Sequence, residues 1–193
     1  FRGGRQSGSE SVAEDLALTA RVDCTPAPGL LFGGSGYSGD TAQGNAGIDG
    51  GRLAVWDAHL EWTWRGLHVR GLYARASLDD AAAINAANMV MVLDAGVGSR
   101  LKGYYGELGW NLLSPRKGTG QELTPFVRYE SFDTQAAVPA GFISSPANDR
   151  TFVTYGFRYR PIPNVALKLD YLDAGDAAGT GVDQFNFALG YLF

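Results

Sequence analysis

The sequence predicts an all-β protein whose fold class is a transmembrane antiparallel up-and-down β-barrel. Large apolar residues occupy every second position of the last ten, from Phe185 to Phe193, and seven other stretches alternate similarly. The segments between these stretches are short and long in turn. A strand that faces lipid needs apolar side chains at alternate positions over about 9–11 residues, and membrane barrels alternate short turns with long loops.

The strands are identified by period-two alternation, because successive side chains of a strand point to opposite faces. In residues 53–64, for example, Trp62 and Trp64 share one face, and His59 and Glu61 share the other. One further stretch is rich in glycine and shows no clear face. The nine predicted strands cover residues 16–24, 30–37, 53–64, 67–78, 101–112, 123–132, 151–160, 165–172 and 184–193.

The connections between these strands fall into two length classes that alternate along the chain. A C-terminus in the periplasm places all the long connections outside and all the short ones inside, as in outer-membrane barrels. A soluble β-sandwich gives no reason for this strict order. The short connections are residues 25–28, 65–66, 114–122 and 161–164, and the long ones are 38–51, 79–99, 133–149 and 174–183.

Composition excludes several other classes of protein. The 193 residues are 45% hydrophobic and 19% charged. No apolar run approaches the roughly 18 residues that a membrane helix needs. One cysteine excludes a disulfide framework, and a net charge of −4 argues against a nucleic-acid partner.

The strand count of nine is odd, whereas bacterial single-chain barrels have even counts. We therefore expect one barrel domain over residues 1–193 that is incomplete at its N-terminus and forms the C-terminal part of a larger, even-stranded barrel. The alternative is a complete small barrel in which one strand is miscounted, and the glycine-rich stretch 30–37 is the weakest of the nine.

Five segments carry a family resemblance: YYGELGW at 104–110, PFVRYE at 125–130, YGFRYRP at 155–161, PNVALKLDY at 163–171 and the terminal stretch 183–193. Together they resemble the C-terminal half of Gram-negative outer-membrane porins of the phosphate-selective O/P type, over roughly residues 52–193. The resemblance implies a trimer of 16-stranded barrels that passes small anionic solutes through a ladder of basic residues.

The resemblance also implies a location in the bacterial outer membrane, with the C-terminus in the periplasm. The terminal aromatic residues Phe185, Phe187, Tyr191 and Phe193 resemble the assembly signal of such barrels. The expected partners are therefore outer-membrane lipid and lipopolysaccharide, the barrel assembly machinery and further copies of the chain. The expected function is a water-filled channel for passive diffusion of small hydrophilic solutes, anionic ones included.

The polar face of the strands is the expected wall of this channel. Six basic and six acidic residues share it, Asp23 among them, which departs from a basic ladder. Two interpretations stay open: Arg128, Arg158, Arg160 and Lys168 form one positive strip, or opposite charges pair across strands and neutralise the wall. The predicted pore-lining residues are Arg21, Asp57, Glu61, Arg70, Glu107, Arg128, Glu130, Arg158, Arg160, Lys168 and Asp170.

The sequence predicts no catalytic, metal or cofactor site, and the protein is expected not to be an enzyme. A barrel hydrolase would need a histidine beside a serine or an acid near the outer rim. His59 is expected in the middle of the wall with Asp57 and Glu61, and His68 at the periplasmic end. Residues 34–39 match GxGxxG, but no helix follows. A structural barrel with a filled lumen that holds partner proteins is the main alternative to a channel.

The sequence also predicts one turn and one helix. If Arg65 and Gly66 form a two-residue turn, the opposed pairs are Trp64–Leu67, Thr63–His68, Trp62–Val69 and Glu61–Arg70. A helix is expected within residues 79–93, because two aspartates suit its first turn and an apolar run follows. This run is expected in the pore mouth or against another protomer.

Overall fold

The computed structural model describes residues 15–42, 44, 47–48, 50–88, 96–114 and 120–192. All nine expected strands are present in this part of the chain, with two short helices. In chain order the elements are β1 (Ala17–Ala27), β2 (Leu30–Gly39), β3 (Leu53–Trp64), β4 (Leu67–Leu78), α1 (Ala81–Ala87), β5 (Arg100–Trp110), β6 (Glu122–Ala137), the 3-10 helix η2 (Pro146–Asn148), β7 (Asp149–Ile162), β8 (Val165–Asp176) and β9 (Gln184–Tyr191).

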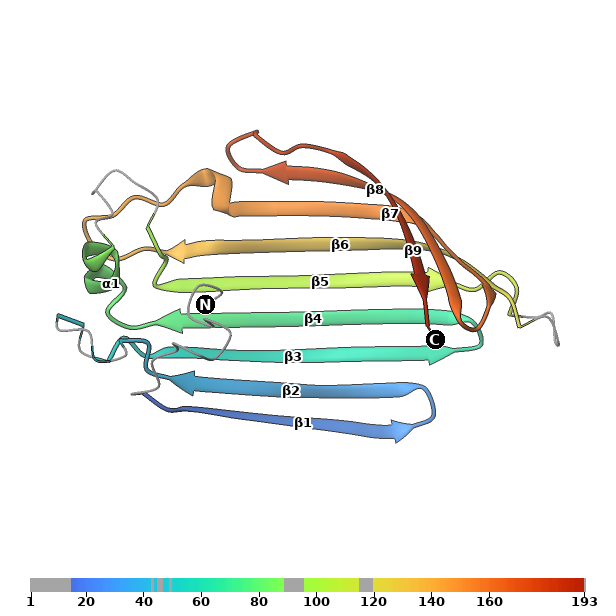
Figure 1. Cartoon of the computed structure of the whole chain (residues 1–193), viewed down its shortest axis with the longest axis horizontal. Coiled ribbons are helices and arrows are strands. Elements are labelled where there is room, and N and C mark those ends of the chain that lie inside the picture. The colour runs from blue at the N-terminus through green and yellow to red at the C-terminus, as the bar shows by residue number, and fades with distance from the viewer. Residues whose placement is uncertain are drawn as a thin grey trace.

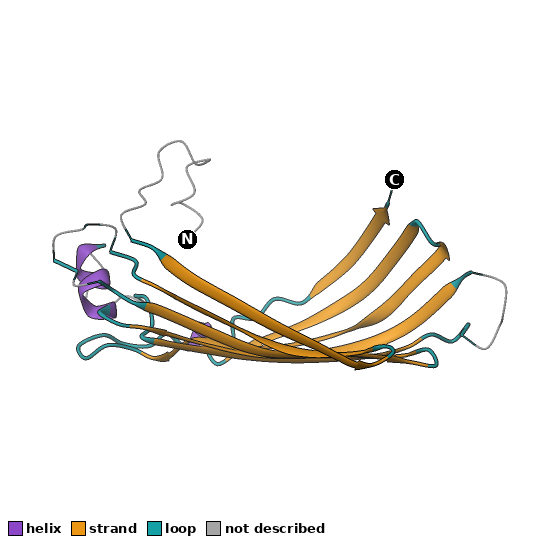
Figure 2. Cartoon of the chain, turned by 90° about the horizontal axis from the view of Figure 1, so that it is seen from below, coloured by secondary structure: helices purple, strands orange, loops and turns teal. Residues whose placement is uncertain are grey.

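The strands form one antiparallel sheet in sequence order, from β1 at one edge to β9 at the other (Figure 1). The sheet is curved and open (Figure 2). The expected closed barrel is therefore absent from the described part of the chain. The physical reason is parity: β1 and β9 run in the same direction, so pairing them would be parallel, whereas an up-and-down barrel is antiparallel throughout.

The predicted register of the hairpin formed by β3 and β4 is confirmed at all four pairs, including Trp64 with Leu67 and Glu61 with Arg70. The turn residues Arg65 and Gly66 have φ of 48° and 88°. Positive φ at both central positions is the requirement of a type I′ turn, whose twist matches that of the flanking strands. A two-residue turn of this type fixes the register of the whole hairpin.

The glycine-rich second strand is a full strand, β2, which pairs with β1 and with β3. The alternative of a complete small barrel assumed that this stretch was wrongly counted as a strand, and the observed pairing removes that assumption. The largest difference from prediction is at β6, which continues to Ala137, five residues beyond the expected end. Alternation is lost there, but backbone pairing persists, since Asp133 pairs with Asp149 and Ala137 with Arg100.

The predicted helix is confirmed for residues 81–87, and residues 89–93 of the expected range lie outside the described part of the chain. The expected aspartate cap is wrong in detail. Asp80 occupies the N-cap position, but it has φ of 54° and its side chain makes no capping hydrogen bond. None of the helices in the described residues is long and apolar enough to cross a membrane.

The long connections at the α1 end of the sheet are held by two buried amide side chains. Asn85 is fully buried; its Nδ2 donates to the Val97 carbonyl at 3.1 Å and its Oδ1 accepts from the Val97 N–H at 2.7 Å. Gln135, on β6, donates to the Gly96 carbonyl and accepts from the Ser145 N–H at 2.6 Å. Asn85 thereby holds the β4–β5 connection together, and Gln135 fastens that connection to the one between β6 and β7.

Replacing Asn85 by alanine should loosen this end of the sheet. The substitution removes a fully buried amide and its two hydrogen bonds to the backbone of Val97, at a cost of about 1–3 kcal/mol. Amide hydrogen exchange at Val97 should therefore speed up. The matched control is N88A, because Asn88 is exposed and donates to the Ile84 carbonyl within its own helix. Equal exchange at Val97 in the two variants would contradict the role of Asn85.

Candidate functional site

All the predicted pore-lining residues lie on one face of the sheet, as the strand pairing requires. Glu61, Arg70, Glu107 and Arg128, for example, stand opposite one another along a single row across four strands. This face is the inner one of the curve, because side chains of strands that are not neighbours meet across it. Phe185, Phe187 and Tyr191 of β9 lie on the other face, and Phe193 lies outside the described residues.

The densest part of the inner face is a charge network on β5, β6 and β7. Glu107 is 11% exposed and accepts from Arg158 Nη2 at 2.8 Å, across the intervening strand β6. The Arg128 guanidinium lies 3.8 Å from Glu107 and 2.9 Å from Glu130. Two arginines and two glutamates therefore neutralise one another.

A second part of this network continues onto β8 and β9. Lys168 Nζ lies 3.0 Å from Asp170, whose side chain is 5% exposed, and Asn186 donates to the same carboxylate at 3.2 Å. Farther along, Arg160 pairs with Glu122 at 3.1 Å. Every member of the expected positive strip thus has a carboxylate partner. Of the two open interpretations, the geometry favours a neutralised wall.

Aromatic rings lie beneath these cations. The Arg128 guanidinium is 3.7 Å from the centroid of the Tyr105 ring, and Arg158 and Lys168 are 5.4 and 5.1 Å from that of Phe126. Phe126 is 6% exposed. Ring faces attract cations and fix the direction of the side chains above them. The sequence places Phe126 on the polar face of its strand, but it does not indicate that cations lie over the ring.

A separate cluster on β1, β2 and β3 surrounds His59. The two ring nitrogens of His59 lie 2.9 Å from Asp57 Oδ1 and 2.8 Å from Asp23 Oδ1. Arg21 pairs with Asp23 at 2.9 Å, and the hydroxyl of Ser35 donates to Asp57. The cluster therefore links β1 to β3 above β2. Sequence reasoning missed Ser35 because its strand has no clear face.

The cluster can form only because a glycine lies below it. A Cβ atom at Gly33 would come within 2.3 Å of Asp23 Oδ1 and 2.8 Å of His59 Nε2. With a hydrogen at this position, the imidazole of β3 crosses β2 and reaches the carboxylate on β1. The glycine content of β2, which hides its alternation in the sequence, thus serves the cluster.

The geometry around the two histidines assembles no nucleophile. Ser35 donates to the Asp57 carboxylate rather than to His59, so the imidazole is not placed to take its proton as in a serine hydrolase. His68 Nδ1 lies 3.4 Å from the hydroxyl of Thr63, beside the β3–β4 turn. Within the described residues, no three histidine, cysteine or acidic side chains are grouped so as to hold a metal ion. The non-enzyme assignment stays a prediction.

Outside the strands, Asp183 fastens the connection between β8 and β9. It accepts from the Ala174 N–H at 3.0 Å and from the Tyr171 hydroxyl at 2.7 Å. These bonds favour the carboxylate, so they hold the pKa of Asp183 below its usual value, the backbone bond most of all. The two hydrogen bonds of Asp183 stabilise the folded protein fully at pH values above the pKa that this group has in the unfolded chain. This stabilisation is lost as the pH falls through the lowered pKa of the folded state.

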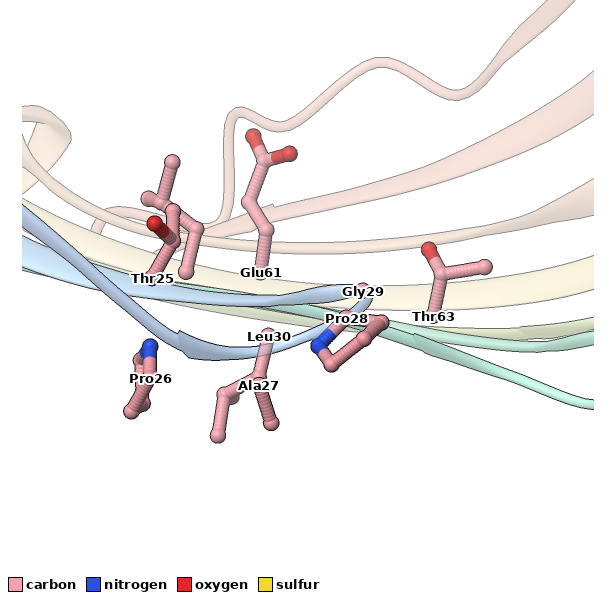
Figure 3. A pocket seen from close by; sticks show the side chains of 9 residues that line it. Thr25, Pro26, Ala27, Pro28, Gly29, Leu30, Glu61 and Thr63 are labelled. Carbon is pink, nitrogen blue, oxygen red and sulfur yellow. The ribbon is translucent and has the colours of Figure 1, made fainter.

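A groove of about 500 Å³ lies at the end of the β1–β2 hairpin (Figure 3). Glu61 and Thr63 point to one side of the sheet there, and Pro26 and Leu30 point to the other (Figure 3). The groove coincides with an irregularity in strand pairing between Cys24 and Ala27. Glu61 is the one charged side chain among the residues that line it, so the groove offers little to hold a ligand.

Comparison with known proteins adds one relative and no family. No family model matches the chain. A protein of Aquifex aeolicus (strain VF5), described as uncharacterized, is 31% identical over an alignment 193 residues long that covers 98% of this chain. The chain spans 44% of the length of that relative. A related stretch therefore occurs within a protein more than twice as long.

Replacing Gly33 by alanine should break the link between β1 and β3. The added methyl displaces Asp23 or His59 and also presses on the Val22 carbonyl oxygen of β1, so amide exchange across this edge strand should accelerate and the protein should lose about 1–3 kcal/mol of stability. G36A is the matched control, because a Cβ at Gly36 of the same strand meets nothing within 4 Å. Equal effects of the two substitutions would show that the cluster does not hold β1.

Proposed function

We propose that this chain is part of the wall of an outer-membrane β-barrel that forms a water-filled channel for passive diffusion of small hydrophilic solutes. The observation that carries the proposal is the contrast between the two faces of the sheet. The inner face is polar and charged, while the outer face is apolar and open to the surroundings. Water suits the first of these faces and lipid suits the second.

The outer face is apolar and carries aromatic residues toward both of its ends. Near the short turns lie Trp62, Trp64 and Trp110, which is 55% exposed, and toward the long connections lie Trp56, Tyr73, Tyr104 and Tyr129. Aliphatic residues such as Leu60, Leu108 and Val127 share the face with these rings. An apolar band roughly 25 Å tall between two aromatic girdles is the pattern of membrane barrels.

The open edges of the sheet support a larger barrel. Strands β1 and β9 run in the same direction, so an odd number of further strands between them would give an even-stranded, fully antiparallel barrel. The length of the Aquifex relative leaves room for such strands. Barrel assembly machinery, a homo-oligomer such as a trimer, and a periplasmic C-terminus belong to the same proposal.

The paired charges of the inner face favour a weakly selective channel over a phosphate-selective one. Arg128, Arg158, Arg160 and Lys168 each have a carboxylate partner within 3.1 Å. The field of a neutralised pair falls off faster than that of a single charge. This part of the wall therefore lacks the basic ladder that the family resemblance implies.

A structural barrel with a filled lumen is the second candidate. Phe132 and Phe152 lie on the inner face and meet edge to face, with ring centroids 5.4 Å apart. Apolar rings on a wall that faces water are unfavourable, so they would suit a lumen occupied by protein. Ion conductance separates the two candidates.

A charge on the outer face should impair insertion far more than one on the inner face. For F187R we expect a cost of about 2–4 kcal/mol, the usual penalty for arginine facing lipid near the bilayer centre. Phe187 is 67% exposed. N186R is the matched control, since Asn186 lies beside Asp170 on the inner face. The readout is the yield of folded protein in the outer membrane, and equal yields of the two variants would contradict a lipid-facing outer face.

The full-length protein in a planar bilayer should conduct ions with little preference for charge. In a salt gradient at low ionic strength, R158Q/K168Q should move the reversal potential toward cations and E107Q/E130Q toward anions, because each variant frees the opposite charge of the network. Both shifts should shrink at 1 M salt, where the Debye length is about 3 Å. Absence of conductance would favour the filled barrel, and unchanged potentials would place this face away from the ion path.

A further inference from the structure

Three cations on the outer face of the sheet differ from all the predicted pore-lining ones. Each predicted basic residue of the inner face has an acidic partner. Arg75, Arg100 and Lys102 are exposed and make no ion pair or hydrogen bond within the described part of the chain. Both faces carry arginine and lysine, but of these cations only the predicted pore-lining ones form ion pairs with carboxylates of the described residues.

These three cations share one spot at the long-connection end of the sheet. Arg75 of β4 stands directly opposite Lys102 of β5, and Arg100 stands opposite Ser77, two residues farther out on the same face. Like charges that face each other across a strand pair destabilise a sheet unless something neutralises them. The arrangement therefore calls for an anion from outside the described chain.

The acidic residues nearby do not supply that anion. Asp133 stands opposite Lys102, but it forms no ion pair with it, and its Oδ1 accepts from the Gln135 N–H at 2.8 Å. Asp79 and Asp80 follow β4 in the turn before α1 and are also without an ion pair to the three cations. Within the described residues, three cations therefore face one carboxylate, and the cluster keeps a net positive charge.

The cations lie at the outer edge of the aromatic residues of the outer face. Arg75 stands opposite Trp56, and Tyr73 and Tyr104 stand opposite each other one step closer to the centre of the sheet. Trp56 and Tyr73 are in contact, with ring centroids 5.3 Å apart. If these rings lie at the membrane interface, the cations at their outer edge lie at the depth of the lipid headgroups.

We propose that Arg75, Arg100 and Lys102 form a binding site for the phosphate groups of anionic lipid headgroups in the leaflet at the long-connection end. This inference rests on the proposed membrane orientation of the sheet. Guanidinium groups bind phosphate oxygens through paired hydrogen bonds, and a lysine adds a compact charge. A lipid fits better than a free anion, because the site lies on the apolar outer face, directly above exposed rings.

The test uses the full-length protein in nanodiscs of zwitterionic lipid into which lipid A, with its two phosphates, is titrated. Bound lipid is counted by native mass spectrometry. R75Q/K102Q should weaken binding by about 30-fold, given roughly 1 kcal/mol for each basic residue near an anionic surface. R75K/K102R keeps both charges and should bind within a few-fold of the natural protein. R65Q removes an outer cation at the opposite end of the sheet and should bind normally.

Each outcome decides the matter. Weakened binding in R75Q/K102Q alone supports the site, and equal binding in all variants overturns it. Competition by millimolar inorganic phosphate would also overturn it, because it would identify a free-anion site. If the natural protein enters nanodiscs but prefers no phosphorylated lipid, this inference fails while the proposed channel stands. If it does not enter a bilayer at all, the proposed function fails, and this inference fails with it.

Discussion

The alternation of side chains across a sheet held in one register is the constraint on which the rest of this structure depends. A shift of one residue in any strand pair would move its charged side chains to the apolar face. The type I′ turn at Arg65 and Gly66 prevents such a shift in the β3–β4 hairpin. Pairing along the other strands, which is interrupted only near strand ends in the β1–β2, β5–β6 and β7–β8 pairs, then carries the same division of faces across the described sheet.

Curvature adds a second level of organisation to this division. Side chains on the inside of a curved sheet converge, so residues two strands apart can meet. Arg158 reaches Glu107 over β6, and His59 reaches Asp23 over β2, where Gly33 leaves the room. Such contacts join strands that are not neighbours in the sheet. They also bring together opposite charges from residues that are far apart in the sequence. The inner face is consequently rich in charged groups and nearly balanced in charge.

The two faces therefore use basic residues in different ways. On the inner face, each predicted arginine or lysine is held by a carboxylate, several over an aromatic ring, which suits a wetted wall with a weak net field. On the outer face, Arg75, Arg100 and Lys102 lie together at the edge of the aromatic residues, and none of them has an ion-pair partner among the residues that the structure describes. A single physical picture, a sheet between water and a bilayer, accounts for both distributions.

The sequence by itself determined the nine strands, their two faces and the hairpin register at Arg65, because these follow from local alternation and turn chemistry. It also placed all the predicted wall residues on one face. Only the tertiary structure decided which charges meet, that Ser35, Glu122 and Asn186 join them, and that β6 extends to Ala137. It also decided that the described sheet is open. The reason is that alternation is a property of one strand, whereas ion pairs and sheet edges depend on stagger, curvature and strand direction across the sheet.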